Sequence, residues 1–366
     1  MSVPPRADNT RRDYTGNHIL GDSRCPNRVP NPSQHARDLL NIYARETTDP
    51  RALVLDGHGA SLTVHRGHLV LRDGIGSTRR ERRLSRIERT VRRIIVLAHS
   101  GHLTLEAVRW CADHGITVVQ LARDGATLAY AGAVTPSTDD ARIRRGQAIA
   151  GTSTDHPAAL EIARMLLTHK LIGQADNAER LLLERRNADL IRSAADGMHK
   201  ARTIEHLRAT EGKAAALYWQ AWVGASPNWN PADLNRLPAH WCMFTSRATL
   251  GVQYGSNRNA VDPINAALNF GYALAESECR NVSREHNLDP ALGVLHADKI
   301  NRDSLALDLL EVIRPDVDRT IIETLGLDYR RRENYLPLRA FVEDKCGGIR
   351  LTAPLTHEIA ERLPAW

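Results

Sequence analysis

The sequence lacks the features that mark membrane, secreted and disulfide-rich proteins. Hydrophobic residues make up 42% of the 366 residues, but no run approaches the about 18 apolar residues that a membrane-spanning helix requires. The N-terminus, MSVPPRADNTRRDYTGNH, has no apolar segment of a signal peptide, so the sequence predicts a cytoplasmic protein. The five cysteines form no C-x-x-C pair. This scatter argues against a disulfide framework and a thiolate zinc site, and it predicts buried free thiols.

The length and the changes of pattern along the chain predict two domains after an N-terminal extension. Residues 1–50 are rich in Pro, Asn and Arg without a regular period, so we predict an extension that is partly disordered. Residues 51–134 alternate apolar and polar side chains between glycines, which predicts short antiparallel strands and one helix between Thr104 and Gly115. Residues 138–366 have helical spacing almost throughout. The predicted fold class is therefore α+β, with a small mixed β domain followed by a larger all-α domain.

The positive charge of the chain is concentrated in one stretch of the β-rich part. The whole chain carries a formal net charge of +6. The segment RRERRLSRIERTVRR, from Arg79 to Arg93, contains eight arginines against Glu81 and Glu88, so it also carries +6. Such a run is either a solvated surface or a surface that contacts nucleic-acid phosphates. Charge alone leaves both readings open.

A second segment combines a lone histidine with two carboxylates on a predicted helix. In GVLHADKINRDSLALDLLEVIRP, residues 293–315, His296 precedes a helical pattern that carries Asp308 and Glu311 three residues apart on one face. The same face holds Leu and Val side chains. Carboxylates in apolar surroundings are costly to bury unless a cation or a hydrogen-bond donor pairs with them. The pattern therefore predicts a cation near these side chains.

The segment EGKAAALYWQAW offers one more acidic residue, Glu211, at the start of an apolar helical pattern and beside Gly212. Together with the histidine and the helix carboxylates it would form an oxygen-rich site with one imidazole, which suits Mg²⁺ or Mn²⁺. Each residue also has an ordinary structural interpretation. A glutamate at a helix start interacts with the helix dipole, a lone histidine is often structural, and the helix carboxylates could pair with Arg302 or Arg314.

Four segments of the helical part resemble a known family in their sequence and order: EGKAAALYW, DPINAALNFGYALAE, LDPALGVLH and RDSLALDLLEVIRP. They are similar to the C-terminal domain of the CRISPR-associated spacer integrases, the "Cas one" endonuclease family. The β-rich part resembles the N-terminal region of the same family, in LVLDGHGASLTVHRGHLVLRDG and RRIIVLAHSGHLTLEAVRWCADHGITVVQLARDGATLAYAG. The resemblance extends roughly over residues 52–350.

The resemblance implies an activity and a set of site residues. The metal ligands of the family fall on Glu211, His296 and Glu311, and Asp308 matches a further acidic residue of the catalytic site. With Mg²⁺ or Mn²⁺, such a protein would insert short foreign DNA fragments into a CRISPR array by attack of a 3′-hydroxyl on a phosphodiester. Water in place of the 3′-hydroxyl would give metal-dependent nuclease activity.

The resemblance also implies the partners: double-stranded DNA, a second copy of the chain bound through the β domain, and the small "Cas two" protein in a larger integration complex. Two alternatives stay open, a related mobile-element integrase and a catalytically silent DNA-binding scaffold, although the intact metal-ligand set argues against the second. Five arginines are candidates for contact with DNA: Arg79, Arg82, Arg83, Arg86 and Arg258.

Overall fold

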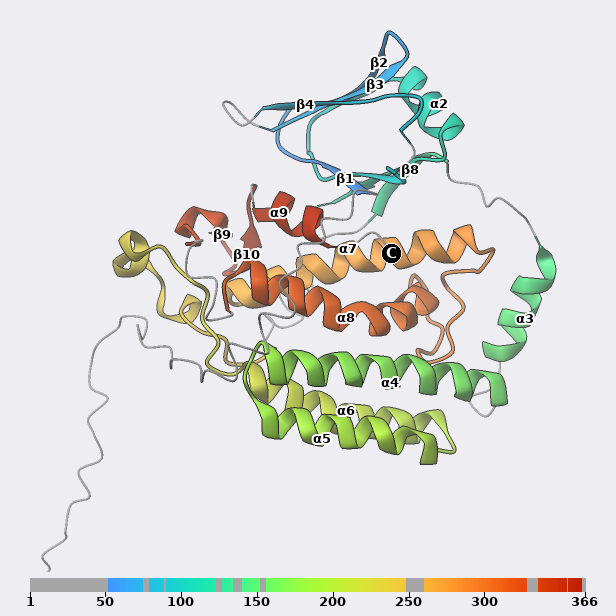
Figure 1. The fold of residues 1–366 in the computed structure, drawn as a ribbon, viewed down its shortest axis with the longest axis vertical. Helices are drawn as coiled ribbons and strands as arrows, with labels where there is room; N and C mark the ends of the chain where they lie inside the picture. Colours follow the sequence, from blue (N-terminus) through green and yellow to red (C-terminus); the bar gives the residue numbers. More distant parts are fainter. Residues whose placement is uncertain are drawn as a thin grey trace, which may run out of the picture.

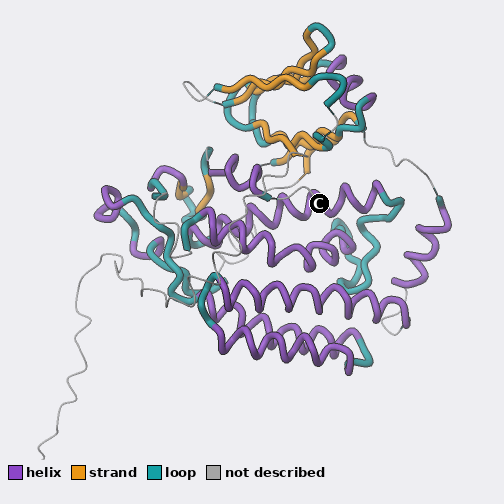
Figure 2. Tube along the Cα trace, in the orientation of Figure 1, coloured by secondary structure: helices purple, strands orange, loops and turns teal. Residues whose placement is uncertain are grey.

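The structure is a computed structural model that combines a β-rich part with a stack of helices (Figures 1 and 2). The predicted extension, residues 1–50, lies outside the residues that the structure describes. Within those residues, the strands of the β-rich part precede the helices along the chain, which agrees with the predicted α+β fold class. The described residues are 52–74, 79–88, 90–122, 127–133, 140–151, 156–247, 260–327, 335–353 and 355–363.

The β-rich part consists of two four-stranded sheets and one helix, α2 (Leu105–Asp113). One sheet has the strand order β1-β5-β7-β8 and the other β4-β3-β2-β6. The antiparallel pairs β2–β3, β3–β4 and β7–β8 agree with the prediction, whereas the parallel pairs β1–β5, β5–β7 and β2–β6 were not predicted. Parallel neighbours are far apart in sequence, so no local pattern indicates them. The strands are β1 (Ala52–Leu55), β2 (Ala60–His65), β3 (His68–Asp73), β4 (Arg80–Leu84), β5 (Arg93–Val96), β6 (Gly101–Leu103), β7 (Thr117–Leu121) and β8 (Thr127–Gly132).

Helix α2 begins and ends where the sequence predicts. The Thr104 side chain accepts a hydrogen bond from the backbone N–H of Ala107 at 3.2 Å, as an N-cap does. Gly115 follows the helix with a φ of +69°, a conformation that glycine adopts without a steric penalty. Local chemistry therefore fixes both ends of this helix.

The second part is mainly helical and also contains a small antiparallel sheet. That sheet pairs β9 (Phe341–Glu343) with β10 (Ile349–Leu351), so the prediction that this part contains helices only is wrong in detail. Both strands have three residues, too few for a recognisable alternation. The helices are α3 (Ala141–Gly151), α4 (Pro157–Arg180), α5 (Arg185–Gly197), α6 (Ile204–Trp222), α7 (Pro263–Glu285), α8 (Ser304–Thr324) and α9 (Leu355–Arg362).

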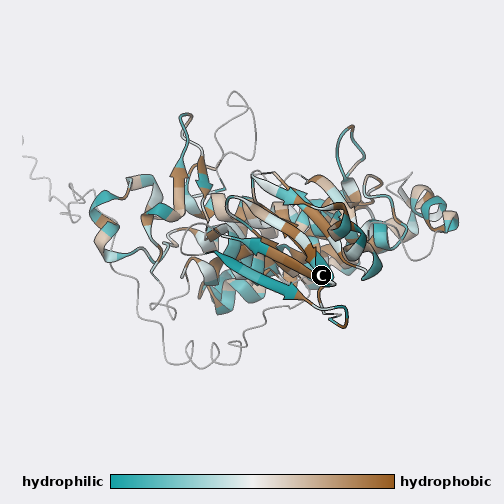
Figure 3. Ribbon diagram, turned by 90° about the horizontal axis from the view of Figure 1, so that it is seen from above, coloured by the Kyte–Doolittle hydropathy of each residue, from teal (hydrophilic) through white to brown (hydrophobic). Residues whose placement is uncertain are grey.

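The two parts share a hydrophobic core. Val54, Ile95 and Val119, from the sheet β1-β5-β7-β8, belong to the same buried cluster as residues of the helices below it. A smaller cluster lies between the two sheets and α2. Hydrophobic and hydrophilic residues both colour the strands in the view from above (Figure 3), because each strand turns some side chains inward and others outward. The sheet nearer the helices thus packs on both of its faces.

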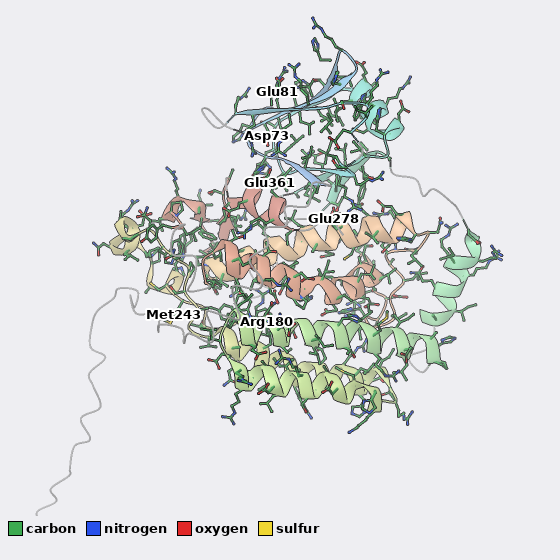
Figure 4. All side chains as sticks on the ribbon, in the orientation of Figure 1. Asp73, Glu81, Arg180, Met243, Glu278 and Glu361 are labelled. Atoms are coloured by element: carbon green, nitrogen blue, oxygen red, sulfur yellow. The ribbon has the colours of Figure 1, made fainter. Side chains whose placement is uncertain are left out.

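Ion pairs, one of them buried, also join the two parts. Arg93, at the start of β5, is 4% exposed and forms ion pairs with Glu278 and, at 3.2 Å, with Glu285, both on α7. On the other sheet, Arg82 lies 2.9 Å from Glu361 of α9. Figure 4 labels Glu278 and Glu361 on the helices that face the sheets.

Part of the basic stretch is therefore a strand with paired arginines, whereas residues 86–87 form an exposed turn. Residues 80–84 form strand β4, and Arg80 lies 2.9 Å from Asp73 of β3 and 3.0 Å from His357 of α9. Carboxylates of neighbouring elements neutralise part of the charge that the sequence places there. The sequence does not indicate these partners, because His357 and Glu361 of α9 are remote in sequence from the arginines that they contact.

The cysteines only partly match the prediction. Burial raises the pKa of the Cys111 and Cys279 thiols to about 12, as expected of buried free thiols. Cys346 is free but exposed, and Cys242 is disulfide-bonded. In the described part of the chain, no helix has both the length and the apolar character needed to cross a membrane.

A glycine sets the distance between α4 and α8. A Cβ at Gly173 of α4 would lie 2.6 Å from the Cβ and 2.8 Å from the Cγ of Pro315 in α8. These distances are too short for carbon atoms in contact, and the proline ring cannot rotate away. The two helices can approach this closely only because residue 173 has no side chain.

We predict that Gly173→Ala lowers the free energy of unfolding by about 1–3 kcal/mol, because the added methyl group forces the two helices apart. Urea denaturation measures the change. The control is Gly146→Ala in α3, where an added Cβ meets no atom within 4 Å, so stability should stay the same or rise slightly. Equal stability of Gly173→Ala and the wild type would contradict the packing argument.

Candidate functional site

Two helices and one loop carry the predicted site residues, and a third helix places a lysine between two of them. Glu211 lies on α6 and Glu311 on α8, and both carboxylates contact the ammonium group of Lys170 on α4. The Lys170 Nζ lies 2.5 Å from Glu211 Oε1 and 2.6 Å from Glu311 Oε2. His296 lies in the segment between α7 and α8. The cation that the buried carboxylates require is therefore supplied, in this structure, by a lysine.

The sequence analysis missed Lys170, although a signal was present. The residue lies in the segment ARMLLTHKLIG, where Leu166, Leu167 and Leu171 are buried, and it is itself only 6% exposed. A lysine within an apolar helical stretch is unusual, because a buried ammonium needs a charged partner. The pattern does not reveal the partner, which comes from other helices.

Glu311 is a buried carboxylate that stays ionised. Burial acts to raise its pKa, but the positive charges of Arg314 and Lys170 outweigh burial and lower the pKa below its usual range. The Arg314 Nε lies 3.3 Å from Glu311 Oε1, so the predicted alternative of an arginine partner holds for this carboxylate. Glu311 Oε2 contacts the lysine but has no hydrogen-bond donor aligned with it. The ammonium group occupies the position at this oxygen that another cation would take.

Asp308 holds the segment that carries the histidine. Its side chain is fully buried and accepts hydrogen bonds from the backbone N–H groups of Val294 at 2.6 Å, Leu295 at 2.9 Å and His296 at 2.8 Å. The same carboxylate lies 2.7 Å from the Nδ1 atom of the His296 ring. A neutral imidazole that donates through Nδ1 has its lone pair on Nε2, which is the arrangement of a metal-binding histidine. Asp308 therefore orients His296, and its own oxygens are already occupied.

The space beside Gly212 is open. A Cβ at this position would meet no atom within 4 Å, so no other part of the described chain approaches the glycine. The missing side chain therefore does not serve the close approach of another backbone from the described residues. Space for an external ligand near Glu211 is compatible with the structure.

The donor set fits a hard divalent cation, although the side chains do not yet converge on one. Among the described residues, no group of three or more His, Cys, Asp and Glu side chains is close enough to hold a metal ion. Mg²⁺ and Mn²⁺ nevertheless accept the ligands that are present, which are the carboxylates of Glu211 and Glu311 and the imidazole of His296. One oxygen of Glu311 lacks a hydrogen bond, and the imidazole is oriented through Nδ1. The ammonium group of Lys170 lies between the two carboxylates and contacts both.

A buried carboxylate two turns further along α8 supports this helix from within the core. Asp318 is fully buried and accepts hydrogen bonds from the hydroxyl groups of Tyr218, at 2.8 Å, and Tyr272. Burial raises the pKa of Asp318 to about 6, against the opposing effect of the two hydroxyl donors. Arg314 stacks on the Tyr272 ring at 4.8 Å. The guanidinium next to Glu311 is thereby connected to the core.

The candidate DNA-binding arginines differ in their surroundings. Arg79, Arg82, Arg83 and Arg86 are exposed, but Arg82 pairs with a glutamate of α9 and Arg83 lies 2.7 Å from Glu81 on the same strand. For Arg79 and Arg86, the structure gives no ion pair with a carboxylate of the described residues. Arg258 lies outside the described residues. Among the described residues, none of the four forms an ion pair with Glu211 or Glu311.

Comparison with known proteins identifies relatives over most of the chain. The family model described as CRISPR associated protein Cas1 matches residues 53–337. The CRISPR-associated endonuclease Cas1 2 of Rhodospirillum rubrum is 33% identical over 232 residues, which are 59% of this chain and 60% of that protein. The CRISPR-associated endonuclease Cas1 1 of Archaeoglobus fulgidus is 28% identical over 290 residues, 75% of this chain and 78% of that protein.

Solved structures share the fold. A casposase bound to its integration product has a TM-score of 0.64 and 25% identity, covering 86% of this chain and 81% of the casposase. A Cas1 protein from Thermotoga maritima has a TM-score of 0.59 and 17% identity, covering 85% of this chain and 88% of its own. A chain of a partial Cas6-RT-Cas1–Cas2 complex has a TM-score of 0.53 and 19% identity, covering 85% of this chain and 86% of its own. The predicted α+β fold is confirmed by these likenesses.

We predict that Asp318→Asn changes the pH dependence of stability. The Asp318 carboxyl group has a pKa of about 6 in the folded chain, against 3.8 for the ordinary side chain. Between pH 3.8 and 6, the folded chain therefore binds more protons at this group than the unfolded chain does. Its contribution to stability is therefore present at low pH and is lost as the pH rises through 6. Relative to the wild type, the variant should gain about 2 kcal/mol between pH 4.5 and 7.

Urea denaturation at both pH values tests this prediction. Asp289→Asn is the control, because Asp289 contacts neither of the two tyrosines that hold Asp318. A constant difference in stability between Asp318→Asn and the wild type at the two pH values would show that Asp318 is ionised in the folded chain throughout this range.

Proposed function

Because the chain belongs to the CRISPR-associated Cas1 family, whose model covers residues 53–337, we propose that it is a divalent-metal-dependent DNA integrase and endonuclease of CRISPR adaptation. The observation that carries the proposal is the convergence of Glu211 and Glu311 on one cationic group, in the helical part that also holds the oriented His296. Carboxylates from separate helices that converge on a metal ion are typical of phosphoryl-transfer sites, and these two carboxylates converge in this way on the lysine.

Each residue has a separate task in this proposal. Glu211, His296 and Glu311 would hold Mg²⁺ or Mn²⁺, which when bound would polarise a phosphoryl oxygen and stabilise the attacking and leaving oxygens. Asp308 contacts the Nδ1 atom of the His296 ring and so orients the ring with Nε2 as the atom left to bind a metal. Arg314, already anchored on Tyr272, keeps Glu311 ionised and adds positive charge beside the scissile phosphate.

The proposed reaction is an exchange of ester bonds on phosphorus. A 3′-hydroxyl of the incoming DNA gives its proton to solvent and attacks a phosphodiester at the repeat boundary, so that a new P–O bond forms. The P–O bond to the 3′-oxygen of the array strand breaks, and this oxygen takes up a proton from solvent. When water attacks instead, the product is a cleaved strand. Neither reaction forms a covalent bond to the protein, which agrees with the absence of a nucleophilic Ser or Cys from the predicted site.

The integration assay separates this proposal from its two alternatives. The purified chain, the small Cas2 partner and Mg²⁺ or Mn²⁺ are incubated with short duplexes and a plasmid that carries a CRISPR array. Integration at the repeat boundary supports spacer acquisition. Integration of transposon ends without Cas2 would support the mobile-element function, which the likeness to a casposase favours. Metal-independent DNA binding without strand transfer would indicate a silent scaffold.

A homodimer formed through the β-rich part is the second element of the proposal. Three leucines near α2 and the sheet edges are exposed although they are apolar: Leu103 (43%), Leu105 (87%) and Leu128 (61%). Leu103 lies on β6 and Leu128 on β8, which are edge strands of the two sheets. Exposed apolar residues beside free strand edges are typical of an interface. The Cas2 partner is proposed by analogy with the Cas6-RT-Cas1–Cas2 complex.

We predict that Glu211→Ala, His296→Ala and Glu311→Ala each abolish metal-dependent integration, because a hard metal ion held by three side chains is lost when one ligand is removed. Asp308→Asn should impair activity less completely, since it acts through the histidine. Calorimetric titration with Mn²⁺ measures metal binding directly. The control is Glu205→Ala, an exposed glutamate on the same helix as Glu211. Normal integration by all three ligand variants would refute the assignment.

We predict that Arg79→Ala with Arg86→Ala weakens duplex binding on unrelated DNA sequences, because these exposed arginines have no ion pair with a carboxylate of the described residues and would act through phosphates rather than base edges. Each lost phosphate contact should reduce the slope of log affinity against log salt by about 0.9. Arg82→Ala is the comparison, and a smaller change is expected because Glu361 already neutralises this side chain. An unchanged slope would show that these arginines belong to a solvated surface that does not contact DNA. Weaker binding to one DNA sequence alone would indicate that the arginines read bases.

We predict that Leu105→Asp dissociates the dimer, because a carboxylate at a buried apolar contact must be desolvated. Sedimentation velocity over a range of concentrations measures the association. Ile172→Asp serves as the control, since this isoleucine is also exposed but lies on α4. Dissociation by the Ile172 variant and not by the Leu105 variant would move the interface to the helical part.

A further inference from the structure

Lys170 occupies the place where the proposed function requires a metal ion. We infer that its ammonium group neutralises Glu211 and Glu311 in the metal-free protein, is displaced when a divalent cation binds, and thereby sets the metal affinity of the site. This inference rests on the proposed function, because it presupposes a metal held by the same two carboxylates.

The geometry makes lysine and metal mutually exclusive. The ammonium nitrogen lies 2.5 Å from Glu211 Oε1 and 2.6 Å from Glu311 Oε2, and the Lys170 side chain is only 8% exposed. Mg²⁺ binds carboxylate oxygens at about 2.1 Å, so it would take the same space between the same two oxygens. One of the two cations must leave before the other can bind both carboxylates.

The local charge balance gives the same result. In the metal-free site, the two negative charges of Glu211 and Glu311 are matched by the positive charges of Lys170 and Arg314. A divalent cation added to this group would leave an excess of positive charge in a mostly buried region, which is unfavourable. Removing the lysine instead would leave two carboxylates close together with one cation. The lysine thus stabilises the site without metal and competes with metal for it.

The choice of lysine suits a displaceable cation. Only five of the 49 basic residues are lysines, and one of these five fills this position. An ammonium group on a flexible four-carbon chain can swing away as a unit, whereas a guanidinium is planar and makes several directed contacts. Arg314 shows the contrast, because its guanidinium contacts the Tyr272 ring at 4.8 Å as well as Glu311. Of the two cations, Lys170 is the one that can move.

Replacement of the lysine by methionine tests the inference on the full chain. Lys170→Met keeps the length and apolar stem of the side chain but removes the charge. If the lysine occupies the site for most of the time, the variant should bind Mn²⁺ about tenfold or more tightly in calorimetric titration. Its melting temperature should fall in EDTA and rise further than that of the wild type when Mn²⁺ is added. The matched control is Lys213→Met, an exposed lysine on α6, which should leave the affinity within about twofold.

The outcomes separate this inference from the proposed function. Unchanged or weaker Mn²⁺ binding by Lys170→Met, with loss of binding in Glu311→Gln, would overturn the role of the lysine and leave the metal site intact. Full Mn²⁺ binding by both Glu211→Gln and Glu311→Gln would overturn the metal site itself. An equal increase in Mn²⁺ affinity in Lys170→Met and Lys213→Met would show that any lost positive charge nearby has this effect, and it would overturn the inference.

A measurement on the wild type does not depend on the folding of any variant. Reductive methylation with formaldehyde labels accessible lysines, and peptide mapping reports each one, with Lys200, Lys213, Lys299 and Lys345 as internal references. In EDTA, Lys170 should react much more slowly than the references. At a Mn²⁺ concentration that saturates the site in calorimetry, its labelling should increase several-fold while that of the references stays constant. Equal or slower labelling of Lys170 with Mn²⁺ would overturn the displacement.

Discussion

The need to neutralise buried carboxylates is the constraint on which the helical part of this protein depends. Glu311 and Asp308 on α8 are buried, and neither has solvent to stabilise its charge. The two carboxylates are stabilised by different partners. Glu311 has two cationic neighbours, Lys170 and Arg314, and Asp308 has backbone N–H groups and an imidazole. These contacts connect α4, α6 and the segment before α8 to α8, and loss of one partner would be strongly destabilising.

Helix α8 organises these contacts because its polar residues recur at helical spacing. Glu311, Arg314 and Asp318 follow one another at intervals of three and four residues, so their side chains lie along one face. Pro315 lies within this stretch and has no N–H group to donate to the carbonyl of Glu311. Its own carbonyl accepts a hydrogen bond from the Asn177 side chain at 2.6 Å. The helical hydrogen bond that Pro315 cannot form would have ended at Glu311, a proposed metal ligand. The hydrogen bond from Asn177 of α4 holds the helix at this point.

The sequence predicts those features that depend on neighbours along the chain. The helix that carries Asp308 and Glu311, the capped ends of α2 and the antiparallel hairpins follow from local spacing and local hydrogen bonds. Features formed by distant segments were not predicted. Lys170 meets Glu211 across 41 residues of sequence, and Arg80 meets His357 across 277. The demand for a cation could be read from the carboxylates, but the identity of that cation could not, because three helices must pack before it is in place.

The basic stretch illustrates how a formal charge differs from a charge that a surface presents. In strand β4, successive side chains point to opposite faces. Arg80 and Arg82 face α9 and contact His357 and Glu361, while Glu81 and Arg83 lie on the other face. Arg93 is buried against α7. A part of the charge counted along the sequence is therefore used to attach the β-rich part to the helices, and only the remaining arginines are available to phosphates. Because strand alternation decides this division, replacing a residue in β4 affects either domain attachment or the outer surface, according to the face on which it lies.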